Sequence, residues 1–410
     1  MLLGLASTVD AQQPPRVDSN APGWQRVPFP ADAQSLSFVN PDTGWVVGDN
    51  GAFYTSDAGQ HWQLRASGGF GQVHFFDANE GWLLNGRMLH TLNGGLSWDT
   101  TSPPFSNGPT GMLWLNSDTG FVFGFEEMAR IVRQDTGWSW LSASCPEFAT
   151  GGSVASMGFF DSGHVHGLAL GGAHYVSQQY PNSPTIIRSD DGGKTWYRPE
   201  WAEGTGYFTD LLIIDSTRAL GFHNNWRTTD RGSTWVLDTT LAAYTFTHVS
   251  FHDVKNGLGC GVVGLIAVTN DSGQTWTHET SGTLETIKDI QLLDSADAFA
   301  VGTNGLFLRT TNGGFSNVKQ NTQFPLTIKL YPDPAQQSIS FEYTLSQLQH
   351  VTFLIYSVNG TLVSTPVNAE AEASGSYSFS LNTASLASGN YSFVFSSENY
   401  YQTGQFQVIH

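Results

Sequence analysis

A short phrase that returns along the chain constrains the fold more than any other feature. It has an Asp or Asn, a Gly two residues later and, in all copies except the last, a Trp five residues after the Asp or Asn. Copies of a phrase at a spacing of roughly forty residues predict a β-propeller, and seven copies predict seven blades. The copies run over Asp57–Trp62, Asn93–Trp98, Asp135–Trp140, Asp191–Trp196, Asp230–Trp235, Asp271–Trp276 and Asn312–Asn317.

Each copy has the composition of a turn between two strands. The Asp or Asn side chain can accept backbone N–H groups inside the turn, and Gly adopts a positive φ without Cβ strain. The Trp begins the next strand, where its ring can pack between neighbouring sheets. We therefore interpret the Asp and Trp residues of the phrase as scaffold, on the face of the ring opposite to any binding surface.

Further strand-like segments precede each phrase. Short apolar runs bounded by Gly, such as residues 44–48, are typical of buried strands, and alternating segments such as residues 72–77 predict the innermost strands. Four strands make a blade, and blades must stack because one blade cannot bury both of its faces. The last copy has Asn317 in place of Trp, so we expect Trp24 and the strand after it to complete that blade. The alternative is an ordered N-terminal tail.

The repeated phrase resembles the Asp-box of sialidase-like propellers. Its longer form, a Gly-aromatic strand followed by Thr-x-Asp-x-Gly-x-Thr-Trp, is more similar to propellers related to the photosystem II assembly and stability factor. This resemblance covers residues 22–322 and implies an all-β, seven-bladed propeller. It implies little about function, since many bacterial relatives of that family have no role in photosynthesis.

The segment of residues 325–410 contains, in order, Tyr331-Pro332-Asp333-Pro334, Asn359-Gly360 and Gly389-Asn390-Tyr391. With these motifs it resembles the type A sorting domain of type IX secretion. Two features depart from that family: Asp333 stands where Asn is usual, and residues 406–410 lack the usual basic residue. The alternation of apolar and polar residues predicts a small, Ig-like β-sandwich here in any case. The resemblance implies the type IX secretion machinery as a partner. The motif residues are Tyr331, Pro332, Pro334, Asn359, Gly360, Gly389 and Tyr391.

Composition fits a secreted or outer-cell-surface β protein. Only 13% of the residues are charged, and the net charge of −18 argues against binding to nucleic acid or to anionic membranes. No apolar run is long enough to span a membrane. Residues 1–11 resemble the end of a signal peptide, and the alternative is a disordered tail.

Cysteines and histidines give no sign of a cofactor. Cys145 and Cys260 are expected far apart in the ring and without a disulfide. No Cys or His spacing indicates a zinc site. His74 and His248 alternate with apolar residues, so they are expected to pack or to line the channel. We expect no metal and no cofactor.

One sector of the face opposite the Asp/Trp turns is rich in aromatic rings and carboxylates. Flat rings stack on sugars and peptides, and carboxylates accept hydrogen bonds, so this sector is a candidate ligand-binding site. The alternative is that the rings pack the loops down and the acids are solvated. The candidate residues are Glu126, Glu127, Glu147, His174, Tyr175, Tyr180, Glu200, Trp201, Glu203 and Tyr207.

Two functions compete. The favoured one is a non-catalytic propeller that binds an extracellular protein or glycan. The rival is an extracellular glycoside hydrolase or lyase, which would use two carboxylates of this sector roughly 5–10 Å apart. No catalytic residue is predicted, because the Arg-Ile-Pro opening of sialidases is missing and the nearest string, Arg130–Arg133, falls in the wrong blade.

Overall fold

The computed structural model describes residues 23–125, 127–135, 137–143, 152–173, 184–199, 208–222, 225–238, 241, 244–314, 328–346, 348–357, 362–397 and 401–410. Every regular element in these residues is a β-strand, as the sequence predicts, and within them no helix could cross a membrane. The predicted signal segment, residues 1–11, lies outside the described residues.

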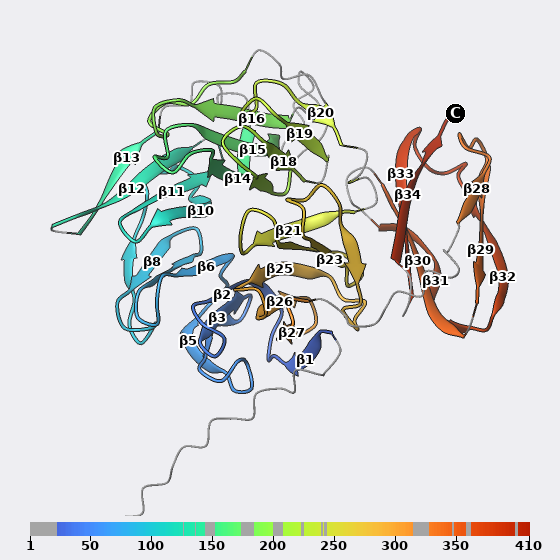
Figure 1. Ribbon diagram of the computed structural model, residues 1–410, viewed down its shortest axis with the longest axis horizontal. Coiled ribbons are helices and arrows are strands. Elements are labelled where there is room, and N and C mark those ends of the chain that lie inside the picture. The colour runs from blue at the N-terminus through green and yellow to red at the C-terminus, as the bar shows by residue number, and fades with distance from the viewer. Residues whose placement is uncertain are drawn as a thin grey trace, which may run out of the picture.

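Seven sheets of the described strands lie around a ring (Figure 1). The first strand of each sheet lies towards the middle of the ring. These inner strands are β2 (Ala33–Phe38), β6 (Gln72–Phe75), β10 (Pro109–Asn116), β14 (Gly152–Phe159), β17 (Leu211–Ile213), β21 (Phe246–Phe251) and β25 (Ile287–Leu292). The second strands are β3 (Gly44–Gly48), β7 (Gly81–Leu84), β11 (Thr119–Gly124), β15 (Gly167–Ala173), β18 (Ala219–Gly221), β22 (Gly257–Gly261) and β26 (Ala298–Gly302).

Consecutive strands pair antiparallel, so each sheet is an up-and-down meander. The third strands are β4 (Gly51–Thr55), β8 (Met88–Thr91), β12 (Met128–Gln134), β16 (Pro184–Ser189), β19 (Trp226–Thr228), β23 (Ile266–Thr269) and β27 (Leu306–Thr310). The outer strands are β5 (Gln63–Ser67), β9 (Asp99–Thr101), β13 (Gly137–Ser142), β20 (Val236–Leu237), β24 (Thr277–Glu279) and β1 (Gln25–Pro28). The fourth sheet has three described strands, and a bridge from Arg188 to Tyr197 lies at its outer edge.

Aromatic side chains fill the spaces between neighbouring sheets. Trp45 of β3 stacks on Phe75 of the next sheet with ring centroids 3.5 Å apart, and both are buried. The Gly at the start of the second strand makes room for a ring of the inner strand. A Cβ at Gly44 would lie 2.5 Å from Phe38, and one at Gly81 would lie 2.4 Å from Phe75. The glycine-bounded runs of the sequence therefore mark where these rings pack.

The Asp-box turns follow the third strands, and their polar groups bond to one another. After β23, the Thr269 hydroxyl accepts the Gly273 N–H at 3.0 Å and donates to Asp271 Oδ1 at 2.9 Å. Asp271 also accepts the Thr275 N–H at 2.8 Å, and Trp276 Nε1 donates to the Gly273 carbonyl at 3.2 Å. The bonds to the turn N–H groups recur around Asp57, Asn93, Asp191 and Asp230.

The third copy of the phrase has a different geometry. β12 and β13 stay paired up to Gln134 and Gly137, directly around Asp135. Trp140 Nε1 donates to the Thr101 hydroxyl of the neighbouring sheet at 3.3 Å rather than to a glycine of its own turn. The Asp-box geometry predicted for Asp135 and Trp140 is therefore not found, because the pairing of β12 with β13 continues up to Gln134 and Gly137.

The N-terminal strand closes the ring. β1 pairs antiparallel with β27 and becomes the outer strand of the last sheet. Trp24 is 8% exposed, and its ring lies 3.2 Å from the place where a Cβ on Gly314 would be. In the first Asp-box turn, a Cβ on Gly59 would lie 3.1 Å from the ring of Trp62, the Trp of the same copy. Trp24 thus supplies the ring that the last copy lacks, and the predicted closure is confirmed.

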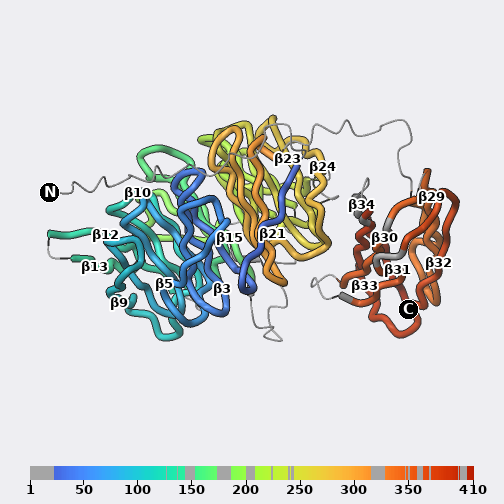
Figure 2. Tube along the Cα trace, turned by 90° about the horizontal axis from the view of Figure 1, so that it is seen from below, coloured from blue at the N-terminus to red at the C-terminus, as the bar shows by residue number. Residues whose placement is uncertain are grey.

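The C-terminal strands form a unit of their own (Figure 2). One sheet has the order β28 (Lys329–Tyr331), β29 (Ser338–Leu345) and β32 (Gly375–Asn382). The other has the order β31 (Leu362–Glu372), β30 (Gln349–Ser357), β33 (Gly389–Ser396) and β34 (Tyr401–Val408). Residues of both sheets share one core, in which Phe341, Phe353 and Phe395 are fully buried.

The opening motif of this unit is tied to its last strand. Asp333 Oδ1 accepts the Gln407 N–H at 2.8 Å, and the Tyr331 hydroxyl donates to Glu342 at 2.6 Å. The side-chain oxygen of an Asn could accept the same N–H, so the Asp at position 333 retains this link. Tyr391 is buried against Phe406. The predicted motif residues Asn359 and Gly360 lie outside the described residues.

Candidate functional site

The inner strands are irregular near the point where they begin. β-bulges interrupt the register of β2, β10, β14, β21 and β25, and each bulge leaves one residue unpaired. A bulge bends its strand and re-aims a side chain. The unpaired residues all lie on the wall of one cavity, and they are Gln34, Thr110, Ala155, Thr247 and Lys288.

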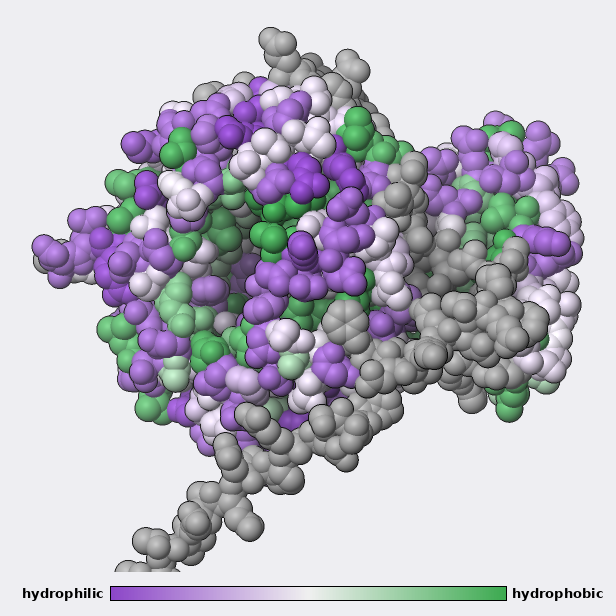
Figure 3. Space-filling view, in the orientation of Figure 1, coloured by the Kyte–Doolittle hydropathy of each residue, from purple (hydrophilic) through white to green (hydrophobic). Residues whose placement is uncertain are grey.

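This cavity has a volume of about 260 Å³ and is lined by residues at or directly before the inner strands of all seven sheets. Most of its wall is polar, with hydroxyl and amide groups, and Met112 and Met157 supply part of the apolar remainder. Figure 3 shows hydrophilic side chains over much of one face of the ring, with hydrophobic side chains visible in the hollow towards its middle. Pockets for drug-sized ligands usually have about 300–1,000 Å³. The size of this cavity therefore suits a single side chain or the end of a chain.

Side chains of one sheet bind the free backbone edge of the next inner strand. Gln72 Oε1 accepts the Met112 N–H at 2.8 Å, and Asp289 Oδ2 accepts the Leu36 N–H at 2.9 Å. The second of these bonds joins the last sheet to the first. An inner strand would otherwise present unpaired N–H groups to the channel, which is costly in a buried edge. Several polar residues of the wall are therefore part of the ring's closure.

His248 lies between two carboxylates at the cavity. Its Nδ1 is 2.9 Å from Asp210 Oδ2, and its Nε2 is 3.4 Å from Asp289 Oδ1. Burial alone would lower the pKa of the imidazole, but the two carboxylates outweigh burial and raise the pKa of His248 to about 9. Burial would raise the pKa of Asp210, but the charge of His248 and backbone N–H bonds lower it. At neutral pH the group is an imidazolium between two carboxylates.

This arrangement holds sheets together, and in the described part of the chain His248 pairs with carboxylates rather than with a nucleophile. The nearest hydroxyl in sequence, that of Thr247, donates to the Ile287 carbonyl at 2.9 Å. The Asp210 carboxylate also accepts the Val249 N–H at 3.0 Å. A catalytic His needs a nucleophile or substrate proton within hydrogen-bond reach on one side. Both ring nitrogens of His248 face carboxylates instead.

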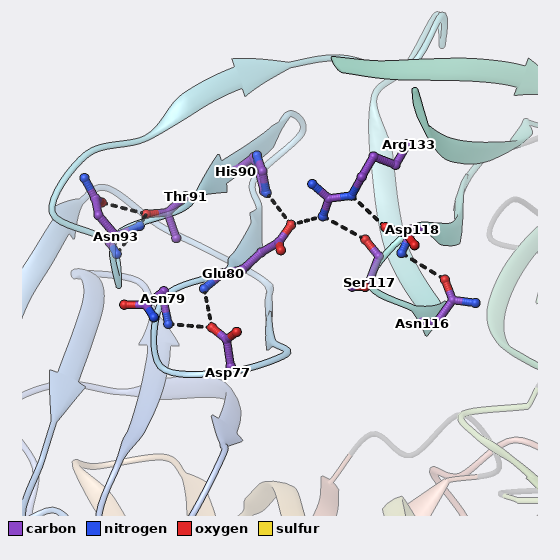
Figure 4. A network of polar contacts seen from close by, with 11 residues as sticks. Asp77, Asn79, Glu80, His90, Thr91, Asn93, Asn116, Ser117, Asp118 and Arg133 are labelled. Atoms are coloured by element: carbon purple, nitrogen blue, oxygen red, sulfur yellow. Dashed lines mark hydrogen bonds and ion pairs between the residues drawn. The ribbon is translucent and has the colours of Figure 1, made fainter. Parts of the chain in front are cut away.

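A second charged network joins the second and third sheets on the side of the Asp-box turns (Figure 4). Glu80 accepts hydrogen bonds from His90 Nε2, at 3.0 Å, and from the Arg133 guanidinium. Arg133 Nε donates to Asp118 at 2.7 Å, and the guanidinium lies over the Trp138 ring. Burial lowers the pKa of His90 despite its carboxylate partner. The charges of this network satisfy one another, so the network is scaffold.

One of the sequence-predicted ligand-binding residues can be placed. The Glu127 carboxylate accepts the Ser106 N–H at 2.7 Å and so ties two surface segments together. The other predicted residues lie outside the described residues, and they are Glu126, Glu147, His174, Tyr175, Tyr180, Glu200, Trp201, Glu203 and Tyr207.

The polar wall of the cavity was not predicted as a site. Its residues are common types, and only the bulges bring them together. His248 was predicted to pack or to line the channel, and it lines the cavity. His74 instead contacts the Phe76 ring, and burial lowers its pKa to about 4. Cys260 is buried and free, and Cys145 lies outside the described residues.

Two family models match parts of the chain. Residues 17–103 match the photosynthesis system II assembly factor YCF48, and residues 329–409 match the secretion system C-terminal sorting domain. Both resemblances predicted from the sequence are thereby confirmed. The sorting-domain match also confirms the predicted location, which is secreted or at the outer cell surface. No curated protein sequence matches the chain significantly.

Solved structures with a similar fold are propellers of several kinds. YCF48 bound to D1 peptide is 21% identical, with a TM-score of 0.53, over 73% of this chain and 99% of that one. YCF48 from Cyanidioschyzon merolae is also 21% identical, with a TM-score of 0.54, over 70% and 98% of the two chains. An extracellular domain of a two-component system from B. thetaiotaomicron is 11% identical, with a TM-score of 0.54, over 95% of this chain and 58% of that one. At these identities the likeness establishes the fold alone.

Proposed function

We propose that this chain is an exported, non-catalytic binding protein that takes a side chain or the end of a partner polypeptide into the central cavity of its ring. The observation that carries the proposal is the cavity of about 260 Å³ with polar side chains from every sheet around it. A polypeptide presents both N–H donors and C=O acceptors, which hydroxyl and amide groups can pair with. Loops and strand ends on a rigid scaffold are where proteins commonly place recognition.

The charges of the cavity support binding rather than catalysis. Asp210 and Asp289 both pair with His248 and with backbone N–H groups, so neither is a free acid or base. Among the described residues, the Lys288 ammonium has no hydrogen bond or ion pair. It lies on the cavity wall at a bulge and is the free charge that a ligand would meet.

A peptide is also the ligand named for a propeller of similar fold, YCF48 bound to D1 peptide. That likeness supports the class of ligand and not its sequence. A rigid ring that recognises a short segment needs little conformational change to bind. Export by the C-terminal sorting unit would deliver such a binder to partners outside the cell.

Peptide and glycan arrays probed with the full chain test the proposal. We expect peptide binding that Lys288→Ala weakens roughly tenfold, the loss of one charge-assisted contact. Lys255→Ala is the matched control, because Lys255 is exposed in the turn between β21 and β22, at the other end of the inner strand. Equal binding by wild type and Lys288→Ala would exclude the cavity as the site.

The rival function, a glycoside hydrolase or lyase, makes a different prediction on the same arrays. It requires glycan binding together with the release of shortened products. One of its proposed acids, Glu127, already accepts a hydrogen bond from the Ser106 N–H through its carboxylate. Product release that depends on Glu200 or Glu203 would favour the enzyme over the binding protein.

A further inference from the structure

One arginine position recurs on the third strands. In four sheets, an arginine of the third strand pairs with the residue at the same position of the second strand. The cross-strand pairs are Phe121 with Arg130, Leu168 with Arg188, Leu220 with Arg227 and Phe299 with Arg309. These four guanidinium groups therefore occupy equivalent places in the repeat.

Two of these arginines reach across to the Asp-box turn of the next sheet. Arg188 donates to the Ser233 hydroxyl, and Arg309 donates to the Ala58 carbonyl at 3.2 Å. Arg227 instead pairs with Asp238 at the outer edge of its own sheet. The usual role of this arginine is thus structural, since the guanidinium finds an acceptor in the protein.

Arg130 is the exception among the four. Its guanidinium has no hydrogen bond or ion pair with the described residues, and its Nε is buried. Ser233 comes three residues after Asp230, and the equivalent place in the turn that Arg130 faces is held by Lys194, three residues after Asp191. An ammonium group has no lone pair with which to accept a bond. The hydroxyl acceptor that Ser233 supplies to Arg188 is therefore replaced, beside Arg130, by the ammonium of Lys194.

Both cations lie on the wall of a pocket of about 250 Å³ between the third and fourth sheets, which His164 also lines. Asp191 is the carboxylate of the described wall, and its oxygens already accept the Ser189 hydroxyl and the N–H and hydroxyl of Thr195. Asp191 offsets part of the positive charge but offers little to the guanidinium. An Arg and a Lys in one pocket, neither with a side-chain partner among the described residues, are notable in a chain with a net charge of −18.

We propose that this pocket binds a compact oxyanion, a carboxylate or a sulfate group, between Arg130 and Lys194. The planar guanidinium can donate two parallel bonds to such a group, and the ammonium adds a point charge. The pocket lies beside the Asp-box turn of residues 191–194, at the opposite end of the inner strands from the central cavity. It is therefore a second site, independent of the peptide site proposed above. The overall negative charge disfavours long polyanions, so the ligand is a single anionic group.

Calorimetric titration of the full chain tests this site. Sodium sulfate and sodium acetate are titrated separately at one ionic strength, with chloride as the background, because salt screens exposed charges. We expect saturable binding of at least one ion, weakened roughly tenfold in Arg130→Gln and in Lys194→Ser. Saturation by sulfate alone would identify a tetrahedral group, and saturation by acetate a carboxylate. The matched control is Arg188→Gln. It removes the equivalent arginine between the fourth and fifth sheets, which is bonded to Ser233, and it should leave the anion affinity unchanged.

Thermal unfolding gives a second readout. Without added anion, Lys194→Ser should raise Tm, because Arg130 gains the acceptor that Arg188 has and loses a neighbouring like charge. Sulfate or acetate should then raise Tm more in the wild type than in that variant, because the wild type binds the ion more tightly. The proposal is overturned if neither ion saturates, if Arg130→Gln binds like the wild type, or if a folded Arg188→Gln loses binding equally.

Discussion

At the scale of single residues, the molecule separates charges that close the ring from charges that stay free. His248 binds Asp210 and Asp289, and those two carboxylates bind backbone N–H groups of the next strands. Arg130 and Lys288, by contrast, have no partner among the described residues. Paired groups are costly to disturb, whereas free ones can change with little effect on folding. Recognition is therefore expected at the free charges.

The His248 pair predicts a loss of stability at alkaline pH. The folded pKa is raised to about 9, whereas an unfolded His titrates near about 6.5, so the stabilisation is full below about pH 6.5 and disappears as pH rises through about 9. Because the His248 side chain is 40% exposed to solvent, water reduces the effect to the order of 1–2 kcal/mol.

Urea unfolding at several pH values across this range measures the effect. His248→Gln should be less stable than the wild type near pH 6 and should lose most of the decline towards pH 9. His252→Gln, an exposed residue at the far end of the same strand, is the control and should keep the decline. A wild-type free energy of unfolding that stays flat over the range would contradict the assignment of an imidazolium.

At the scale of elements, each blade uses its strands for a separate purpose. Inner strands carry the bulges that form the cavity, second strands carry the Gly residues that admit aromatic rings, and third strands end in the Asp-box turns. The last sheet depends on β1, which comes from the other end of the propeller sequence. The closure of the ring is thus an interaction between elements far apart in the chain.

Trp24→Ala should open that closure. Removing a buried Trp typically costs about 3–5 kcal/mol, and Trp24 packs in a core with Leu258 and Leu308. The expected result is a lower urea midpoint than that of the wild type, with the all-β circular dichroism retained below it. Arg26→Ala, an exposed change on the same strand, should shift stability by no more than about 0.5 kcal/mol. A Trp24→Ala protein as stable as Arg26→Ala would show that β1 does not hold the ring.

At the scale of the whole molecule, the ring and the C-terminal unit have separate cores. The C-terminal core is built from residues of β28–β34 and the ring from earlier strands. Separate cores allow one unit to be removed while the other folds. The match to a sorting domain indicates that the C-terminal unit carries the secretion signal of the protein.

Deleting residues 325–410 should therefore abolish delivery to the cell surface and leave the propeller folded. Surface labelling of intact cells measures delivery, and the thermal unfolding of the purified truncated chain measures folding. A matched variant with intact sorting residues, Lys255→Ala, should reach the surface normally. Surface display of the truncated chain would contradict the role given to this unit.

The sequence by itself determined the class of fold, the closing role of Trp24 and the sorting unit. These follow from local signals: a turn phrase fixes its own hydrogen bonds, and a repeat implies that identical units stack. The tertiary structure decided the rest. The cavity depends on bulges that bring common residues from seven sheets together, and the pairing of His248 joins positions far apart in the chain. Such contacts depend on register and ring closure, which no local pattern encodes. The third copy of the phrase, around Asp135, shows the same limit. Its sequence favours an Asp-box turn, but β12 and β13 stay paired up to Gln134 and Gly137 instead.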